Sequence, residues 1–193
     1  MKIILASKSG VRKKILDDHS IACEVIVSNV DEDEIKTSLE AEGADPLIIS
    51  KNLAEVKSIK VSNKIADQLV LGADSVISLN NKLINKPKSR EEALNILRKL
   101  NNSKHYLISS ACISKNGAML WNHSDSSELK MKNLTERELS NYLKKISTET
   151  LLSYGVYQVE ADGLELFEYI KGDHNSIMGL PIKEIINYIK NYK

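Results

Sequence analysis

The sequence predicts an α/β or α+β fold in which helices flank a mixed β-sheet. Two observations support this prediction. Helical and strand-like segments alternate along the first half of the chain, whereas strand-like segments joined by short turns dominate the second half. Alternation favours parallel strands and tight turns favour antiparallel ones, so the sheet should contain both. No internal repeat and no linker divides the 193 residues, and we treat residues 1–193 as a single domain.

The first half shows two clear helix starts. Ser9 can cap the first helix, and Asp45 followed by Pro46 combines an N-cap carboxylate with proline at the first helical position. The sequence Gly72-Ala73-Asp74 is expected to interrupt a long strand. The expected elements are strands at 2–5 and 22–27, a helix ending near 18, an acidic loop at 30–35, a helix from 46 to about 63, and strand-like segments at 69–79 and 82–84.

Two capping boxes and one hairpin signal organise the second half. Ser89 with Glu92, and Thr135 with Glu138, have the spacing at which an N-cap hydroxyl and a carboxylate satisfy each other's backbone N–H groups. Asn116-Gly117 predicts a tight hairpin turn. The expected elements are helices after 89, from 135 to about 146 and from 182 onward, and strands at 105–114, 118–122, 128–132, 156–160 and 164–169.

The charge balance excludes several classes of partner. Lysine and arginine number 27 and aspartate and glutamate 26, so no global field attracts a nucleic-acid polymer. No apolar run approaches the roughly 20 residues that span a bilayer, and no secretory signal is visible. We therefore expect a cytoplasmic protein without a membrane or nucleic-acid partner. Cys23 and Cys112 each lie in an apolar run and are expected to be buried.

The sequence contains none of the common catalytic signatures. It has no Walker-type phosphate loop and no GxGxxG, HExxH or GxSxG motif, and its cysteines and histidines lack zinc spacing. The four histidines are scattered, and such lone histidines are more often structural than catalytic. His105 is the best candidate among them because it begins a strand.

Polar residues at strand ends give two candidate sites. A strand stops before Ser7, and the free N–H groups at the start of the next helix would bind an anion together with Arg12, whose fork matches phosphate. Asp74 lies in an otherwise apolar strand, where an ionised carboxylate is costly unless it is paired or bound to metal. Lys86 must lie on extended chain because Pro87 follows it. The structural alternatives are a capped helix with a solvated basic face, and a turn at Asp74 with a solvated Lys86.

Two further features could complete such a site. The acidic segment from Asp31 to Glu34 could supply hard oxygen ligands to a divalent cation, although a run of acids is more often a solvated loop. Lys57 lies near the apolar side of its helix and could either snorkel or reach a phosphate. Together these features predict a magnesium-assisted phosphoryl site, in which cations hold a polyphosphate and carboxylates hold metal and activate water.

Six sequence motifs occur in an order typical of one protein family. They are LASKSGVRKKIL, VDEDE, LAEVKSIKV, GADSVISLNNKLINKP, SREEALNILRKLNNSKHYLISSACI and IKGDHNSIMGLPI. In this order they resemble the Maf family of nucleoside triphosphate pyrophosphatases over essentially the full chain. The resemblance implies an elongated mixed sheet of the inosine-triphosphatase type, a cleft between two lobes, and often a homodimer. It also implies cleavage between the α and β phosphates with Mg²⁺ or Mn²⁺, as housecleaning of non-canonical or excess nucleotides.

The resemblance also implies a role for each matching residue. Asp74 matches the proton acceptor for the attacking water, and Glu32 with Asp74 would hold the metal. Four residues match positions that hold the substrate's phosphates, namely Ser7, Arg12, Lys57 and Lys86.

Three positions that the resemblance links to base selectivity depart from the common family patterns. Val11 stands where arginine is usual, Ser75 replaces the threonine of GADT, and Glu160 replaces a glutamine. A carboxylate only accepts hydrogen bonds, so Glu160 would favour a base edge with N–H donors, such as guanine. The 7-methyl-GTP enzymes of the family also have an acid at that position. The preferred base and metal stay open.

The family's association with septum formation motivates a second hypothesis, a non-catalytic nucleotide-binding regulator of cell division. The retained Asp74, Glu32 and both lysines argue against it, since a pure binder has less need of a base. A nucleic-acid-binding module is disfavoured by the even charge balance and the scattered lysines.

Overall fold

The computed structural model describes residues 2–159 and 162–192. The chain forms two compact units. Unit 1 comprises Met1–Val76, Ile108–Ser126 and Asp173–Lys193, and unit 2 comprises Ile77–Leu107 and Ser127–Gly172. Three long strands contribute residues to both units: β3 (Val70–Leu79), β5 (Lys104–Lys115) and β6 (Ala118–Met131).

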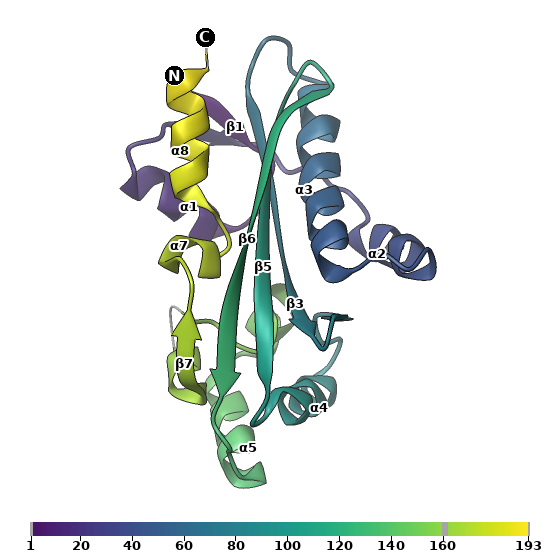
Figure 1. Ribbon diagram of the computed structural model, residues 1–193, viewed down its shortest axis with the longest axis vertical. Helices are drawn as coiled ribbons and strands as arrows, with labels where there is room; N and C mark the ends of the chain where they lie inside the picture. The colour runs from purple at the N-terminus through teal and green to yellow at the C-terminus, as the bar shows by residue number, and fades with distance from the viewer. Residues whose placement is uncertain (1, 160–161, 193) are drawn as a thin grey trace. The chain divides into compact units, whose positions relative to one another are not determined.

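Unit 1 is built on parallel strands with helices on both faces. Its other elements are β1 (Ile3–Leu5), α1 (Gly10–Asp18), β2 (Cys23–Val25), α2 (Glu32–Ala41), α3 (Pro46–Ser62), α7 (His174–Ile177) and α8 (Ile182–Asn191). Strand β1 pairs in parallel with β2 and with β3, so that Leu5 lies opposite both Val25 and Leu71. Helices α1 and α8 lie on one side of these strands and α3 lies on the other (Figure 1).

Unit 2 adds antiparallel pairs to the ends of the long strands. Its other elements are β4 (Lys82–Ile84), α4 (Arg90–Leu100), α5 (Glu136–Lys145), α6 (Thr148–Tyr154), the 3₁₀ helix η1 (Asp162–Leu166) and β7 (Phe167–Lys171). Strand β4 runs antiparallel to β3 through a turn at Asn80 and Asn81, which both have positive φ. Strand β7 runs antiparallel to β6. The strand order β2-β1-β3-β5-β6-β7, with β4 beside β3, confirms the predicted mixed sheet.

Residues of β3 alternate between the two helical layers of unit 1. Leu71 and Ala73 belong to a buried apolar cluster with residues of α1 and α8. Val70 belongs to a second cluster with Val61 of α3. Gly72 also faces α3, because a Cβ atom there would lie 2.1 Å from the carbonyl oxygen of Ala54. Since side chains along a strand point to opposite faces in turn, Asp74 is expected on the α3 face and Ser75 on the α1 face.

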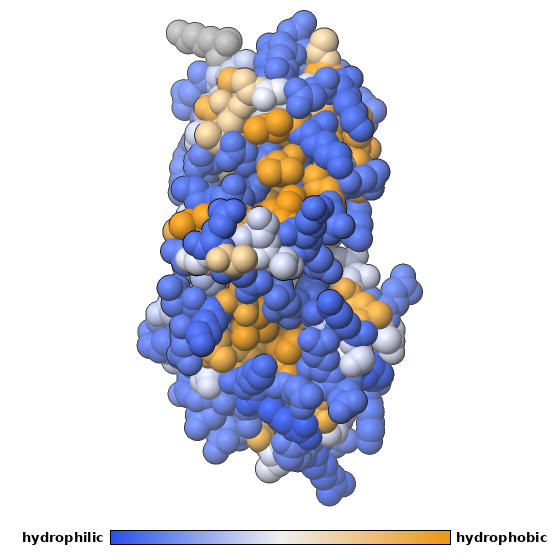
Figure 2. All heavy atoms as spheres, turned by 90° about the vertical axis from the view of Figure 1, so that its right-hand side faces the viewer, coloured by the Kyte–Doolittle hydropathy of each residue, from blue (hydrophilic) through white to orange (hydrophobic). Residues whose placement is uncertain are grey.

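The surface on the α3 side is largely hydrophilic, with apolar groups gathered in separate patches (Figure 2). Leu47 and Ile48, in the first turn of α3, are among the exposed large apolar residues. In the residues that the structure describes, no helix is both long and apolar enough to cross a membrane.

The acidic segment is a helix start, and the predicted loop at 30–35 is wrong. Asp31 is the N-cap of α2, and its Oδ1 accepts a hydrogen bond of 3.0 Å from the Glu34 backbone N–H. Glu32, Asp33 and Glu34 fill the first turn. Their charges interact favourably with the positive end of the helix dipole, so a cluster of acids stabilises this helix terminus.

Two predicted interruptions of strands are also wrong. Strand β3 continues through Gly72-Ala73-Asp74, because Gly72 allows α3 to approach and Asp74 is paired with a lysine. Strand β6 replaces two separate predicted strands, and its polar middle is satisfied by side chains. Within it, Ser124 hydrogen-bonds Ser110, and Asp125 accepts a hydrogen bond from Ser176.

The described residues on either side of 160–161 differ from their predicted structure, and position 160 itself lies outside the described residues. Helix α6 was not expected, and residues 156–159 form no strand. The predicted strand at 164–169 is shifted, since η1 comes first and β7 begins at Phe167. Of the two expected capping boxes, Thr135 with Glu138 is complete. The Glu92 carboxylate instead accepts from the Lys88 backbone N–H, so the Ser89 box is only half formed.

Candidate functional site

A buried lysine bridges two carboxylates in unit 1. The Nζ of Lys57 lies 2.7 Å from Oδ1 of Asp74 and 2.8 Å from Oε1 of Glu32. Lys57 and Asp74 are each only 5% exposed, whereas Glu32 is partly open to solvent. The fold therefore brings together three residues that were predicted from the sequence: Glu32 of α2, Lys57 of α3 and Asp74 of β3.

The local fold explains how these three charges meet. Asp45 caps α3 by accepting a hydrogen bond from the Ile48 backbone N–H, and Pro46 opens the helix. Gly72 allows the backbone of α3 to contact β3, which brings Lys57 of the helix within reach of Asp74. A charged pair in such a buried position is tolerated because each charge has its counterion at hydrogen-bond distance.

One oxygen of Asp74 is available for a ligand. Its Oδ2 is buried and has no hydrogen-bond partner within the described chain. A buried oxygen without a partner is costly, and a metal ion or a water molecule would satisfy it. No group of three or more potential His, Cys, Asp or Glu metal ligands occurs in the described residues. Because Mg²⁺ commonly uses one or two carboxylates and completes its shell with water and phosphate oxygens, Asp74 and Glu32 fit such an ion.

Arg12 lies at the centre of a second network in unit 1. Its Nη1 donates to the Ala73 carbonyl at 2.9 Å and to Ser7 Oγ at 3.2 Å. Its Nη2 donates to Ser75 Oγ at 3.1 Å, and its Nε donates to the Gly179 carbonyl at 2.9 Å. Burial lowers the pKa of Arg12 from its usual value, while the carboxylates of Asp74 and Glu32 act in the opposite direction.

Ser7 lies two residues after the end of β1 and is buried. Its Oγ accepts hydrogen bonds from the Ser9 backbone N–H and from Arg12, each at 3.2 Å. Since the oxygen is the acceptor in both bonds, the hydroxyl hydrogen can serve an anionic ligand. Ser9 in turn caps α1, as predicted, by accepting a hydrogen bond from the Arg12 backbone N–H.

Four further residues were predicted as site residues, namely Val11, Ser75, Lys86 and Glu160. Val11 is partly buried against the apolar core between β3, α1 and α8. Ser75 is held between Arg12 and Ser109. Lys86 belongs to unit 2, where it is exposed between β4 and α4. Glu160 lies outside the described residues.

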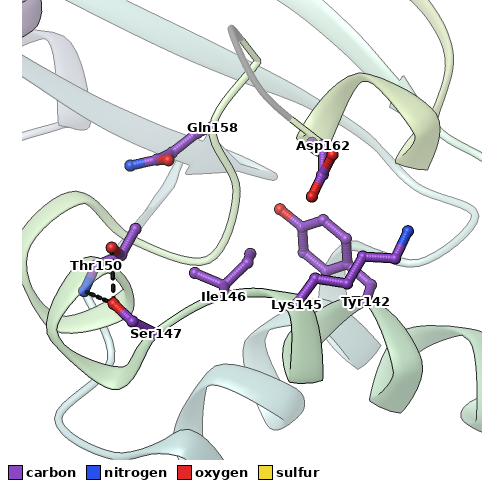
Figure 3. Close-up of a pocket in the computed structure, with 8 residues that line it drawn as sticks. Tyr142, Lys145, Ile146, Ser147, Thr150, Gln158 and Asp162 are labelled. Atoms are coloured by element: carbon purple, nitrogen blue, oxygen red, sulfur yellow. Dashed lines mark hydrogen bonds between the residues drawn. The ribbon is translucent and has the colours of Figure 1, made fainter.

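Unit 2 contains a separate small pocket of about 190 Å³ (Figure 3). It is bounded by the end of α5, the start of α6 and the chain on either side of residues 160–161. Figure 3 shows Gln158 and Thr150 on one side of the pocket and Tyr142 with Asp162 on the other. Of the residues predicted to hold phosphate or metal, none lines it.

Sequence reasoning missed two members of the Arg12 network. The hydroxyl of Ser109 lies 2.9 Å from that of Ser75, and Ser109 is fully buried in β5. Consecutive serines in an apolar strand were the available signal, because buried hydroxyls need partners. Gly179 is the second missed member: its backbone has φ of 101°, and its carbonyl accepts a hydrogen bond from Arg12. A carbonyl acceptor leaves no trace in the sequence.

A family model and the sequences of known proteins match the chain over nearly its whole length. The family model described as Maf-like protein matches residues 2–192. A nucleoside triphosphate pyrophosphatase of Pelagibacter ubique (strain HTCC1062) is 57% identical over 192 residues, covering 100% of this chain and 98% of that protein. A 7-methyl-GTP pyrophosphatase of Rhizobium etli is 35% identical over 189 residues, covering 98% and 95%. Among solved structures, a HAM1 protein from Coxiella burnetii has a TM-score of 0.47 at 14% identity, covering 69% of this chain and 74% of that chain.

Proposed function

Because the chain belongs to the Maf family, we propose that it is a nucleoside triphosphate pyrophosphatase. The reaction adds water to the α phosphorus, breaks the bond to the bridging oxygen of the β phosphate, and yields a nucleoside monophosphate and pyrophosphate. The observation that carries the proposal is the buried contact of Lys57 with Asp74, in which one carboxylate oxygen of Asp74 stays open to a ligand.

Asp74 would act as the general base in this reaction. Its Oδ1 is fixed by Lys57, and its Oδ2 is free to accept a proton from water. A base held in one orientation by a neighbouring charge is suited to this task, because the geometry does not have to be established anew at each turnover.

Lys57, Ser7 and Lys86 would hold the phosphates. The charges of Lys57, Arg12, Asp74 and Glu32 sum to zero, so the cluster by itself offers no net attraction to a polyanion. A divalent cation held by Asp74 and Glu32 would supply the missing positive charge and stabilise the charge that develops on the phosphate. A divalent cation such as Mg²⁺ or Mn²⁺ is therefore the proposed cofactor.

The base of the substrate is a finer proposal. Glu160 is an acceptor-only side chain and would pair with the N–H donors of a guanine-type base. The 35% identical relative from Rhizobium etli is named for 7-methyl-GTP, which is consistent with such a base. A housecleaning role against modified or excess nucleotides, a homodimer and a cytoplasmic location are further proposals that rest on the family resemblance.

The test is a panel of guanine, 7-methylguanine, adenine and pyrimidine triphosphates with Mg²⁺ or Mn²⁺, followed by identification of the products. We expect monophosphate and pyrophosphate in equal amounts, with the highest kcat/KM for a guanine-type base. Glu160→Gln should reduce that preference. Release of orthophosphate, or no turnover of any triphosphate, would contradict the proposed reaction.

A further inference from the structure

We propose that Lys36 of α2 binds the two phosphates of the substrate that leave as pyrophosphate. The inference rests on the proposed function. It adds one cation to the positions that the family resemblance links to phosphate, which are Ser7, Arg12, Lys57 and Lys86. Lys36 itself lies outside the six motifs that carry this resemblance.

Lys36 is the buried residue of α2, with an exposed fraction of 9%. The residues that share its side of the helix are partly covered, namely Glu32, Ile35 and Leu39. Their spacing of three and four residues is that of one helix face. Helix α2 packs against α3 (Figure 1), and Glu32 contacts Lys57 of that helix. The face that carries Lys36 is therefore the one turned toward α3.

The ammonium group of Lys36 forms no hydrogen bond or ion pair within residues 2–159 and 162–192. Glu32 and Glu40 lie four residues before and after it, which is the spacing at which opposite charges pair on a helix. Neither is within ion-pair distance of Lys36, and Glu32 contacts Lys57 instead. Since lysine is almost never buried without a paired charge, the missing anion is assigned to a ligand.

The ammonium group is also accessible to such a ligand. The Nζ atom of Lys36 is not among the buried side-chain atoms that lack a partner, so the covered part of the side chain is its methylene stem. Packing already restricts this stem. Binding of an anion therefore requires less ordering of the side chain than it would at a fully exposed lysine.

The position of Lys36 indicates which phosphates it contacts. Asp74, Lys57 and Glu32 are linked in this order by contacts of 2.7 and 2.8 Å. Lys36 follows Glu32 one helical turn later on the same face, where Cβ atoms lie about 6 Å apart. The α phosphorus has to lie near Asp74, the proposed base. The β and γ phosphates then extend past Glu32 toward Lys36.

Lys36 also changes the charge of the site. Together with Lys57 and Arg12 it gives three cations against the two carboxylates of Asp74 and Glu32. The site then carries a net positive charge before any metal binds. A fixed cation beside the pyrophosphate stabilises the charge that this group gains as its bond to the α phosphorus breaks.

The experiment compares Lys36→Met and Lys36→Arg with the unaltered protein. Methionine keeps an unbranched apolar stem and removes the charge, whereas arginine keeps the charge. Lys51→Met is the matched control, because Lys51 is an exposed lysine of the neighbouring helix α3. Calorimetry measures the dissociation constants of magnesium pyrophosphate and of guanosine monophosphate, and neither measurement requires turnover. Thermal unfolding identifies a Lys36→Met protein that fails to fold, in which case Lys36→Gln takes its place.

We expect Lys36→Met to weaken the binding of magnesium pyrophosphate by about tenfold or more, as the loss of a hydrogen bond to a charged group does. Lys36→Arg should weaken it by less than about threefold, because the charge remains. The affinity for guanosine monophosphate should change by less than about twofold in both variants, since this ligand lacks the leaving phosphates. With guanosine triphosphate as substrate, kcat/KM of Lys36→Met should fall by about tenfold.

Three results would overturn the inference. Equal pyrophosphate affinities of Lys36→Met and Lys51→Met would show that Lys36 only covers apolar surface with its stem. An equal loss of affinity for pyrophosphate and for guanosine monophosphate would show that Lys36 maintains the site as a whole. The third result is an unaltered protein that binds no magnesium pyrophosphate. If the unaltered protein binds pyrophosphate through Lys36 but hydrolyses no triphosphate, the proposed reaction alone is rejected.

Discussion

The two units of the molecule bury their polar groups in opposite ways. Unit 1 buries charges, because Lys57 and Asp74 are both nearly inaccessible and neutralise each other. In unit 2 the described titratable group that is fully buried is His105, which is hydrogen-bonded to the hydroxyl of Tyr157 at 3.0 Å. Burial lowers the pKa of His105 from 6.5 to about 4, so this side chain is neutral at pH 7.

We infer from this difference that the reaction takes place in unit 1 and that the buried histidine of unit 2 stabilises the fold. A buried charge is tolerated only where counterions surround it. Charges that are already fixed in this way can stabilise the charge that develops in a transition state, because the protein does not have to rearrange during the reaction. A neutral histidine packed against Tyr157 and Phe167 serves instead as part of an apolar core. Unit 1 should therefore determine the rate of the reaction, and unit 2 should contribute through its exposed Lys86 and through its own stability.

Asp74→Asn tests this assignment with the largest expected effect. The amide keeps the shape of the side chain but cannot accept a proton from water, so kcat should fall by about a hundredfold or more. The measurement is steady-state turnover of the preferred triphosphate. Asp67→Asn is the control, because Asp67 lies in an exposed turn and the same chemical change there should leave kcat unaltered. An Asp74→Asn protein with full activity would place the base elsewhere.

Local signals allowed much of the fold to be predicted. The start of α3 follows from Asp45 and Pro46, and that of α5 from a capping box, because these signals lie within four residues of one another. The acidic segment misled the prediction, since the same residues suit a solvated loop and the first turn of α2. Helix α6 and the chain after it depend on tertiary packing that no local pattern reports.

The candidate site was predictable where burial of a single charged residue without a partner would cost free energy. Asp74 in an apolar strand required a partner, and Lys57 on the inner side of its helix supplied one. The hydrogen bonds of Arg12 were not predictable, because Arg12 and the carbonyl of Gly179 are 167 residues apart and any residue type presents a carbonyl. The sequence therefore indicated which charges need a partner, while the full set of their partners became visible only in the fold.

Gly72→Ala tests whether close packing of α3 maintains the charged pair of unit 1. The added methyl would lie 2.1 Å from the Ala54 carbonyl oxygen and 2.7 Å from the Ser58 backbone nitrogen, so the helix must move. We expect the free energy of unfolding to fall by about 3 kcal/mol, as for an overpacked core, and kcat to fall with it. Urea unfolding and steady-state kinetics measure the two effects.

Gly10→Ala is the control for that substitution. Nothing lies within 4 Å of a Cβ atom at Gly10, so its stability should be unchanged or slightly raised. A stable and fully active Gly72→Ala protein would show that the approach of α3 is not required for the contact between Lys57 and Asp74.

His105 gives unit 2 a distinct dependence on pH. The folded state holds this histidine neutral with its pKa lowered to about 4, whereas the unfolded chain protonates it near 6.5. Below pH 6.5 the unfolded state therefore binds more protons, and stability should fall by about 2 kcal/mol between pH 7 and pH 5. His105→Gln should remove this part of the loss in urea unfolding at the two pH values, whereas His19→Gln, at an exposed position, should keep it.

Lys86→Ala has the smallest expected effect. It tests most directly whether unit 1 determines kcat while unit 2 contributes to substrate binding. Lys86 is exposed in unit 2 and is predicted to contact phosphate, so its loss should remove binding common to substrate and transition state. KM should rise by about tenfold, which corresponds to one charged hydrogen bond, and kcat should change by less. Lys88→Ala, two residues along the same exposed loop, is the matched control in the same kinetic assay. A fall in kcat as large as that of Asp74→Asn would mean that unit 2 supplies a charge needed in the transition state, and the comparison between the units would fail.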